Sequence, residues 1–244
     1  MKREFADLHL CLNTRNSTAA QGVMLKVAAL GYDLVGIPFT PETPETEISN
    51  FRKICKDAKV DLASRVDLVP KTRNQLIRLL AKLRRRFEVI CVICENKEVA
   101  RQAAKDRRVD MLSFHSLEYK GRFFDWAEAE LASSGTASLE VDVKPLLLLE
   151  GPTRVRLLSY LRREVSIAMS FRVPIVVSSG VGTELLLRKP RELAALVSLL
   201  GFNETSALDV VSTNPIAIVT RNRQKLSRDF VAPGIRVIKE GGDC

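Results

Sequence analysis

Short apolar runs alternate with longer amphipathic stretches from one end of the chain to the other. A run of about four to eight apolar or β-branched residues between turn residues indicates a buried strand. The predicted strands are residues 5–10, 34–39, 62–68, 88–94, 111–114, 138–143, 174–179 and 216–219.

Apolar residues three and four positions apart indicate the buried face of a helix. The clearest example is 71–87, where Leu76 and Leu80 belong to an apolar stripe and basic residues cover the remaining surface. Pro190 opens another helix and Gly201 closes it, as their backbone preferences favour. The predicted helices are residues 17–30, 44–58, 71–87, 97–105, 123–132, 151–170, 190–200 and 204–211.

Strands that alternate with helices and are apolar on both faces predict a parallel sheet that is covered by helices. No Gly-x-Gly-x-x-Gly motif follows the first strand, so a closed barrel is favoured over a Rossmann sheet. The length of 244 residues is also close to that of a barrel with eight strands. We predict an α/β fold, a TIM-like (β/α) barrel in a single domain over 1–240, with a frayed tail at 241–244.

Composition narrows the classes of function. Lys and Arg outnumber Asp and Glu by 38 to 29, which suggests a polyanionic partner, although a basic surface also serves solubility. No apolar window is long enough for a membrane span, and the first residues run straight into a strand without a signal peptide. The five cysteines form no disulfide or zinc pattern, and Cys91 and Cys94 fit a strand core. We expect a cytoplasmic protein with no membrane contact.

Polar residues stand at the predicted C-terminal ends of the strands, where barrels of this kind collect functional groups. On the first strand Asp7 and His9 alternate with Leu8 and Leu10, which predicts both polar side chains on one face. The other polar residues expected at this end are Arg65, Asp67, Glu95, His115, Glu140, Asp142 and the turn Ser178-Ser179-Gly180.

A bound metal is one interpretation of this cluster, because carboxylates and imidazoles are common ligands. The chain has only two histidines, however, and Arg65 is expected to pair with Asp67, which then needs no metal. We therefore predict no metal, no cofactor and no catalytic residue in this chain. The Ser178-Ser179-Gly180 turn is either a phosphate site or simply the exit of a strand.

Basic residues also recur outside the predicted barrel opening, for example in Arg84-Arg85-Arg86 and Arg107-Arg108. Few aromatic residues are available to stack on unpaired bases. Contact with the phosphates of structured RNA therefore suits the composition better than recognition of single strands.

Several segments resemble protein component 3 of archaeal and eukaryotic ribonuclease P, and their order extends over most of the chain. The segments are FADLHL (5–10), GYDLVGIPF (31–39), SRVDL (64–68), DMLSF (110–114), SLEVDVKPLL (138–147), VPIVVSSG (173–180), RKPRELAALVSLLGF (188–202) and STNPIAIVTRNRQKLS (212–227).

The resemblance implies a barrel akin to the polymerase and histidinol phosphatase superfamily of metal-dependent phosphoesterases. That superfamily opens with His-x-His, whereas Asp7 stands at the first position here, so the resemblance implies a barrel without its metals. The implied role is to bind the ribonuclease P RNA, which cleaves the 5′ leader of precursor tRNA and uses magnesium itself. The implied protein partners are component 2, a small ferredoxin-like subunit, and the other ribonuclease P subunits.

Residues for RNA binding are carried over only where basic positions lie in or beside the matching segments. They are Arg65, Arg107, Lys120, Arg122, Lys144, Arg221 and Arg223, with His115 added. The competing hypotheses are a metal-dependent phosphoesterase that requires Asp7 and a barrel that only scaffolds other proteins.

Overall fold

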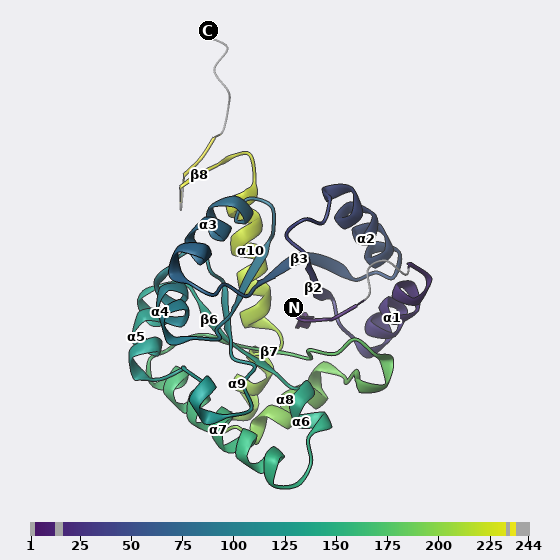
Figure 1. The fold of residues 1–244 in the computed structure, drawn as a ribbon. Coiled ribbons are helices and arrows are strands. Elements are labelled where there is room, and N and C mark those ends of the chain that lie inside the picture. The colour runs from purple at the N-terminus through teal and green to yellow at the C-terminus, as the bar shows by residue number, and fades with distance from the viewer. Residues whose placement is uncertain (1–2, 13–16, 233–234, 238–244) are drawn as a thin grey trace.

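The strands form one parallel sheet whose order in space follows the order of the sequence (Figure 1). The computed structural model describes residues 3–12, 17–232 and 235–237. The strands of this sheet are β1 (Ala6–Asp7), β2 (Leu34–Phe39), β3 (Asp61–Leu68), β4 (Val89–Ile93), β5 (Met111–Ser113), β6 (Ser138–Asp142) and β7 (Ile175–Ser178).

The sheet curls until its two edge strands meet. Leu10, just beyond β1, forms a parallel bridge with Val181, just beyond β7. Nearer the N-terminal ends of the strands, Val211 accepts a hydrogen bond from the Ala6 amide at 3.0 Å. Its neighbour Val210 accepts one from the Val177 amide at 2.9 Å. These two carbonyls close the barrel where an eighth strand would lie. The predicted TIM-like barrel is confirmed, but its sheet has seven strands.

The predicted strand at 216–219 is wrong, because these residues belong to helix α10 (Thr213–Leu226). Four consecutive residues of the type Ile-Ala-Ile-Val match a strand by composition. Their burial instead follows helical spacing, since Pro215, Ile218, Val219 and Asn222 are the buried positions. Pro215 lies in the first helical turn, where a missing amide hydrogen costs nothing.

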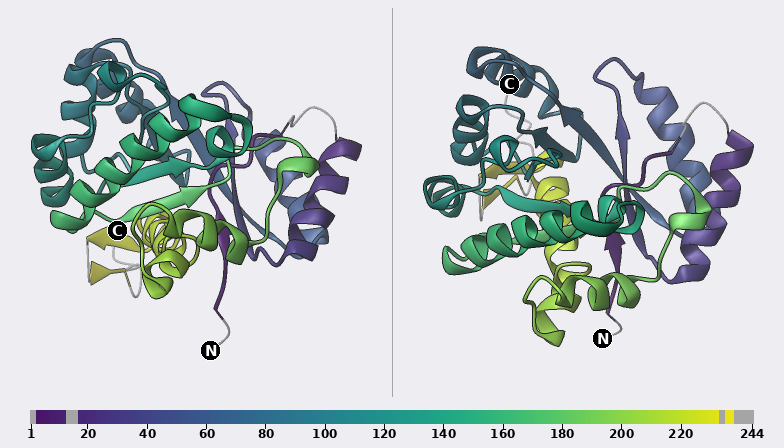
Figure 2. Two further views of the ribbon diagram at one scale, coloured as in Figure 1. Left: turned by 90° about the horizontal axis from the view of Figure 1, so that it is seen from below. Right: turned by 60° about the horizontal axis from the view of Figure 1, so that its bottom comes forward.

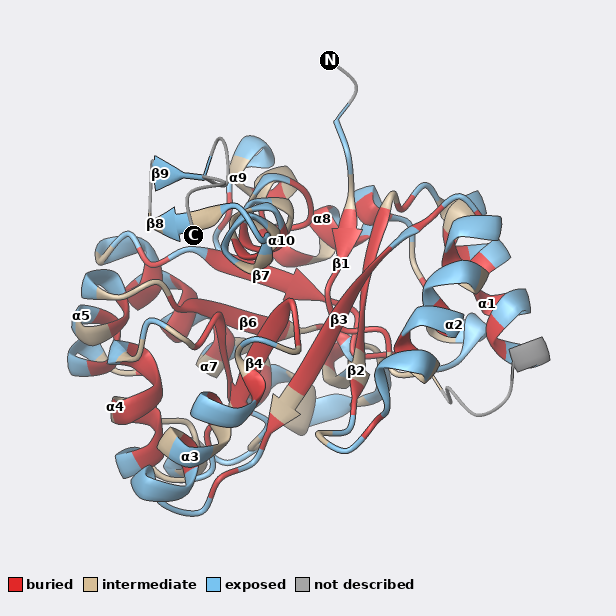
Figure 3. Cartoon of the chain, turned by 90° about the horizontal axis from the view of Figure 1, so that it is seen from above, coloured by how far each residue is buried: buried red, intermediate tan, exposed pale blue. Residues whose placement is uncertain are grey.

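Helices surround the barrel, and their inner faces carry most of the apolar core (Figures 2 and 3). Side-chain oxygens of Thr72, Asn96 and Asp125 cap three of them by accepting backbone amides of the first turn. The other helices are α1 (Ser17–Leu30), α2 (Glu45–Asp57), α3 (Arg73–Leu83), α4 (Lys97–Lys105), α5 (Trp126–Ser134), α6 (Lys144–Leu148), α7 (Gly151–Ser170), α8 (Pro190–Ser198) and α9 (Glu204–Asp209), with single 3-10 turns at Tyr119–Gly121 and Glu184–Leu186.

The barrel interior is layered, since alternate residues of each strand point inward. We call the end at the N-termini of the strands the floor, and the opposite end the mouth. At the floor, Ile218 and Val219 of α10 pack against an apolar inner cluster. The other residues of that cluster are Ala6, Leu8, Leu34, Ala63, Val89, Cys91, Met111 and Val176. Arg65 of β3 and Glu140 of β6 lie nearer the mouth, and Asp67 and Asp142 follow two residues later on the same strands.

After α10, a short antiparallel hairpin of β8 (Phe230–Ala232) and β9 (Ile235–Arg236) lies beside the end of that helix. The predicted tail at 241–244 lies outside the described residues. Within the described part of the chain, no helix combines the length and the apolar character needed to cross a bilayer.

Candidate functional site

A buried ion pair lies at the centre of the barrel. Arg65 has no exposed surface, and its two terminal nitrogens donate to the Glu140 oxygens at 2.5 and 2.7 Å. Its Nε donates to Asp67 at 2.6 Å, as expected from the sequence, and Nη1 also donates to the Leu8 carbonyl at 2.8 Å. Burial opposes the ionisation of Glu140, but Arg65 outweighs this effect and lowers the pKa of Glu140 to about 2.

This geometry corrects the prediction that Arg65 contacts RNA. A fully buried guanidinium that is engaged by two carboxylates and a carbonyl is not available to a phosphate on the surface. Its role is to supply the positive charge that the inward carboxylates require.

His9 lies above this pair, at the mouth. Its Nδ1 is 2.9 and 3.0 Å from the two oxygens of Asp142, and its Nε2 is 3.2 Å from the Cys11 sulfur. Burial and Arg65 disfavour the imidazolium, but Asp142 and Cys11 favour it more strongly and raise the pKa of His9 to about 11. His9 is therefore a cation at neutral pH.

Asp7 does not share this site, contrary to the prediction of one common face. Asp7 pairs in register with Val35 of the outer core, and a bend at Leu8 intervenes before His9. One Asp7 oxygen accepts the amides of His9 and Ser179, and the other is buried with no hydrogen-bond partner among the described residues. Burial raises the pKa of this carboxyl group.

The Ser178-Ser179-Gly180 turn is a strand exit rather than a phosphate cradle. The amides of Ser179, Gly180 and Val181 donate to Asp7, to the His9 carbonyl and to the Ser179 hydroxyl, respectively. The Ser178 hydroxyl donates to Glu140 at 2.8 Å. These donors are therefore already engaged inside the protein.

Among the described residues, the group most suited to a metal ion is His9, Glu140 and Asp142, whose ligand atoms lie within 4.8 Å of one another. Both Glu140 oxygens, however, accept from Arg65, and both Asp142 oxygens contact His9. A metal would have to displace a guanidinium and an imidazolium that already balance these carboxylates. The residues present do not fit a metal ion.

A second cluster lies at the floor, where the charges of Arg84, Arg107, Arg221 and Asp110 all act on Lys225. Arg84 donates to Asp110 at 2.5 Å and to three backbone carbonyls, and Arg221 donates to Asp110 at 3.2 Å. Partial burial together with Arg221, Arg84 and Arg107 lowers the pKa of Lys225, against the opposing effect of Asp110. We call these four basic residues the floor cluster. It carries more positive charge than its single carboxylate neutralises.

The other predicted RNA-binding residues fall into two groups. Arg122 is almost fully buried and donates to both Glu164 oxygens, and Arg223 is paired with Asp61 and Glu88. Arg122 is therefore structural and not available to a phosphate, whereas 37% of the Arg223 side chain stays accessible beside its two carboxylates. The exposed predicted residues are His115, Lys120 and Lys144 near the mouth and Arg107 at the floor.

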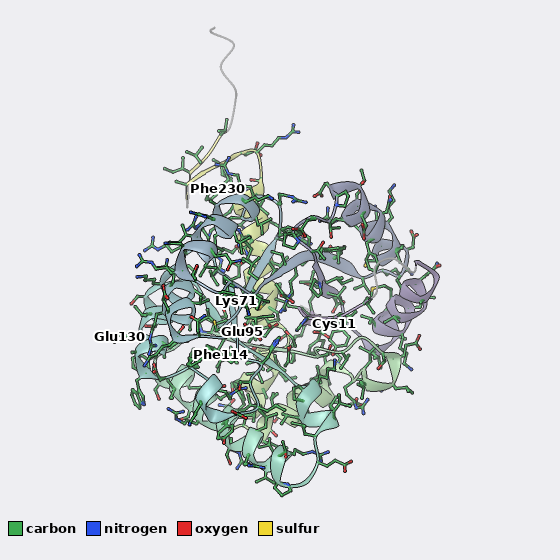
Figure 4. All side chains as sticks on the ribbon, in the orientation of Figure 1. Cys11, Lys71, Glu95, Phe114, Glu130 and Phe230 are labelled. Atoms are coloured by element: carbon green, nitrogen blue, oxygen red, sulfur yellow. The ribbon has the colours of Figure 1, made fainter. Side chains whose placement is uncertain are left out.

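Glu95 follows β4 at the mouth end, as expected, and pairs there with exposed Lys71; Figure 4 labels both residues. Sequence reasoning missed Lys225. The signal was its position four residues after Arg221, which places both on one helix face, but the misread strand at 216–219 hid that spacing.

Comparison with known proteins gives a concordant result. The profile of the family described as RNase P subunit p30 matches residues 4–227. Ribonuclease P protein component 3 of Methanosarcina barkeri is 34% identical over 176 residues, which are 72% of each protein.

Two solved structures share the fold. A chain in the cryo-EM structure of archaeal ribonuclease P with mature tRNA has a TM-score of 0.83 at 21% identity, and covers 96% of this chain and 99% of its own. The A. niger ochratoxinase has a TM-score of 0.59 at 9% identity, with 89% and 71% covered. The profile match over nearly the whole sequence carries the assignment, and this chain belongs to the ribonuclease P subunit p30 family.

Proposed function

We propose that this chain is an RNA-binding, non-catalytic protein subunit of ribonuclease P that supports removal of the 5′ leader from precursor tRNA. Membership of the p30 family supports this role. So does the mouth, whose carboxylates are engaged by Arg65 and His9 rather than free for catalysis. The RNA subunit performs the cleavage and uses the magnesium, and this chain has no metal of its own.

The floor cluster is the observation that carries the RNA-binding part of the proposal. Partial burial lowers the pKa of Lys225, and Arg221, Arg84 and Arg107 lower it further, so positive charges repel one another here in the free protein. A phosphate group placed among these side chains would relieve that repulsion and release counterions from the RNA. Arg107 and Lys225 are the exposed members, and no ion pair engages either side chain among the described residues.

The chain acts in the cytoplasm together with ribonuclease P RNA, component 2 and the other protein subunits, and contacts precursor tRNA indirectly. The archaeal ribonuclease P particle with mature tRNA contains a chain of the same fold, which supports this assembly. The exposed residues His115, Lys120 and Lys144 form a secondary candidate surface at the mouth.

The test is the salt dependence of binding to ribonuclease P RNA. Each phosphate contact contributes about 0.7–0.9 to the slope of log affinity against log salt. We expect Arg107→Ala and Lys225→Ala each to lower the slope by about one and to weaken binding. Lys26→Ala, an exposed change on α1, is the matched control and is expected to leave the slope unchanged.

If both floor variants retain the affinity and slope of the unchanged protein, the floor is the wrong surface. Reconstituted cleavage of precursor tRNA at low magnesium, with and without this protein, tests the subunit role separately. A phosphoesterase would instead hydrolyse a generic phosphodiester without the RNA. A scaffold would bind the protein subunits and show no dependence on RNA.

A further inference from the structure

Cys11, His9 and Asp142 form a connected thiol, imidazole and carboxylate at the mouth. The Cys11 sulfur lies 3.2 Å from His9 Nε2, and Nδ1 of the same ring lies 2.9 Å from Asp142. A cysteine sulfur beside an imidazole ring that is oriented by a carboxylate is the arrangement of an activated nucleophile. Neither RNA binding at the floor nor the buried ion pair uses this thiol.

The backbone holds Cys11 firmly in this position. Its amide donates to the Val181 carbonyl at 2.9 Å, and the Gly180 amide donates to the His9 carbonyl at 3.0 Å. A side chain at Gly182 would place a Cβ only 2.2 Å from the Cys11 carbonyl oxygen, so the glycine permits this close approach. The thiol is thus positioned by both neighbouring strand ends. Figure 4 labels Cys11 near the middle of the view, within the ring of helices.

All three groups line one cavity of about 510 Å³. Its polar lining comprises His9, Cys11 and Asp142 with His115, Arg122, Glu140 and Lys144, and much of the remaining lining is apolar. The apolar lining includes Phe114, Leu117, Leu148, Leu149, Leu157 and Leu161. A cavity of this size accommodates a small organic molecule with an apolar group beside a reactive centre.

Other charged groups face His9 from the surrounding elements. Asp67 of β3 lies 3.5 Å from Nε2, further than the sulfur, and the Arg65 guanidinium lies below. The His115 ring, beyond β5, stacks parallel to His9 at a centroid distance of 6.5 Å. The sulfur is the nearest acceptor for the Nε2 proton among the described side chains.

We propose that Cys11 is a nucleophile and that the mouth cavity is a site of covalent modification by small α,β-unsaturated carbonyl compounds that carry an apolar group. The sulfur forms a bond to the β-carbon, and the π electrons of the C=C bond move toward the carbonyl. The α-carbon then takes the proton held on His9 Nε2, which water replaces. No other reactant is required.

The same chain supplies internal controls. Cys55, Cys91 and Cys94 are at most 2% exposed and have no imidazole contact among the described residues. They are expected to stay unmodified in the folded protein. A Cys244→Ser variant removes the fifth cysteine, so that labelling reports on Cys11 alone.

The experiment measures labelling of this full-length variant by N-ethylmaleimide at pH 6, with the modified peptide identified by mass spectrometry. The reference is the same protein unfolded in urea, corrected with N-acetylcysteine in both solvents. A thiol in solution is almost fully protonated at pH 6 and reacts slowly. We expect Cys11 to react at least about tenfold faster in the folded protein, because the His9 ring 3.2 Å away stabilises negative charge on the attacking sulfur. Equal or slower reaction in the folded protein overturns the proposal.

The role of His9 is tested by adding His9→Gln to the Cys244→Ser protein. The variant is expected to react with N-ethylmaleimide at least about tenfold more slowly at pH 6, because the sulfur loses its imidazole neighbour. Equal rates in the two folded proteins contradict activation by His9. If His9→Gln does not fold, the comparison of folded and unfolded Cys244→Ser protein decides.

The apolar lining is tested with a second, uncharged reagent, N-(2-hydroxyethyl)maleimide. Its hydroxyl group is expected to slow labelling of the folded protein several-fold relative to N-ethylmaleimide, beyond the ratio seen in urea. Equal ratios in both states refute the assignment of an apolar ligand.

Discussion

At the scale of single residues, the Arg65–Glu140 pair explains why the interior of this barrel tolerates so many carboxylates. Both side chains are fully buried, so neither charge is stabilised by water. Replacing Arg65 with Met leaves Glu140 unpaired, and we expect a loss of about 3–5 kcal/mol in the free energy of unfolding. Urea unfolding monitored by circular dichroism measures this loss.

The matched control is the exposed pair of Lys71 and Glu95, whose side chains are 69% and 48% accessible. Lys71→Met is expected to cost at most about 1 kcal/mol, because exposed pairs are weak. Adding Glu140→Leu to Arg65→Met is expected to recover part of the loss, since an apolar pair avoids the stranded charge. No recovery would indicate that the hydrogen bonds to Leu8 and Asp67 matter more than the charge.

A second residue-scale prediction concerns pH. Burial raises the pKa of Glu128 from 4.5 to about 7, although Arg101 opposes the shift. Between these two pH values the folded protein binds more protons at Glu128 than the unfolded chain does, so its contribution to stability falls as pH rises. A shift of this size corresponds to a loss on the order of 3 kcal/mol.

Glu128→Gln removes this titration. We expect the variant to gain stability relative to the unchanged protein between pH 5 and pH 7.5, as measured by urea midpoints. The contribution of His9 to stability also declines as pH rises from 6.5 toward about 11, but it does so in both proteins. A constant difference between the two proteins across this range would contradict the assignment to Glu128.

At the scale of elements, α10 holds the barrel floor through polar contacts as well as apolar ones. The buried Asn222 amide donates to the Glu88 carbonyl and to Asp110, both at 2.8 Å. Asn222→Ala leaves these buried acceptors with fewer donors, and we expect a destabilisation of about 1–3 kcal/mol. Gln224→Ala, on the exposed side of the same helix, is the control and is expected to change stability by less than about 0.5 kcal/mol. Equal effects would show that Asn222 has no special role.

The sequence predicted most elements because their periodicity was unambiguous. Leu34–Phe39 and Gly151–Ser170 match the structure residue for residue. The failure at 216–219 arose because a short β-branched run has the same composition in a strand and in a buried helical turn. Only the packing of α10 against the barrel floor distinguishes the two.

The candidate site was less predictable for a different reason. Strand alternation correctly placed Arg65 and Asp67 together inside the barrel. It failed for Asp7 and His9, because the bend at Leu8 breaks the alternation. Which arginines are free was also hidden, since the partners of Arg122 and Arg223 are distant in sequence.

At the scale of the whole molecule, the two ends of the barrel carry different chemistry. The mouth has balanced charges around His9 and an adjoining apolar cavity, whereas the floor has excess positive charge around Asp110. The proposed RNA contact and the proposed thiol chemistry are therefore separable by mutation. Lys225→Ala is expected to weaken RNA binding without changing the rate at which Cys11 is alkylated.

Helix α10 seals the floor with Ile218 and Val219 and also carries Arg221 and Lys225 of the floor cluster. RNA bound to those cations would also hold α10 against the barrel floor. Displacement of α10 would expose the inner apolar cluster, so bound RNA would stabilise the folded state. A free RNA concentration of about one hundred times the dissociation constant would add about 2.7 kcal/mol to the free energy of unfolding. The protein without RNA would therefore unfold more readily in the cell.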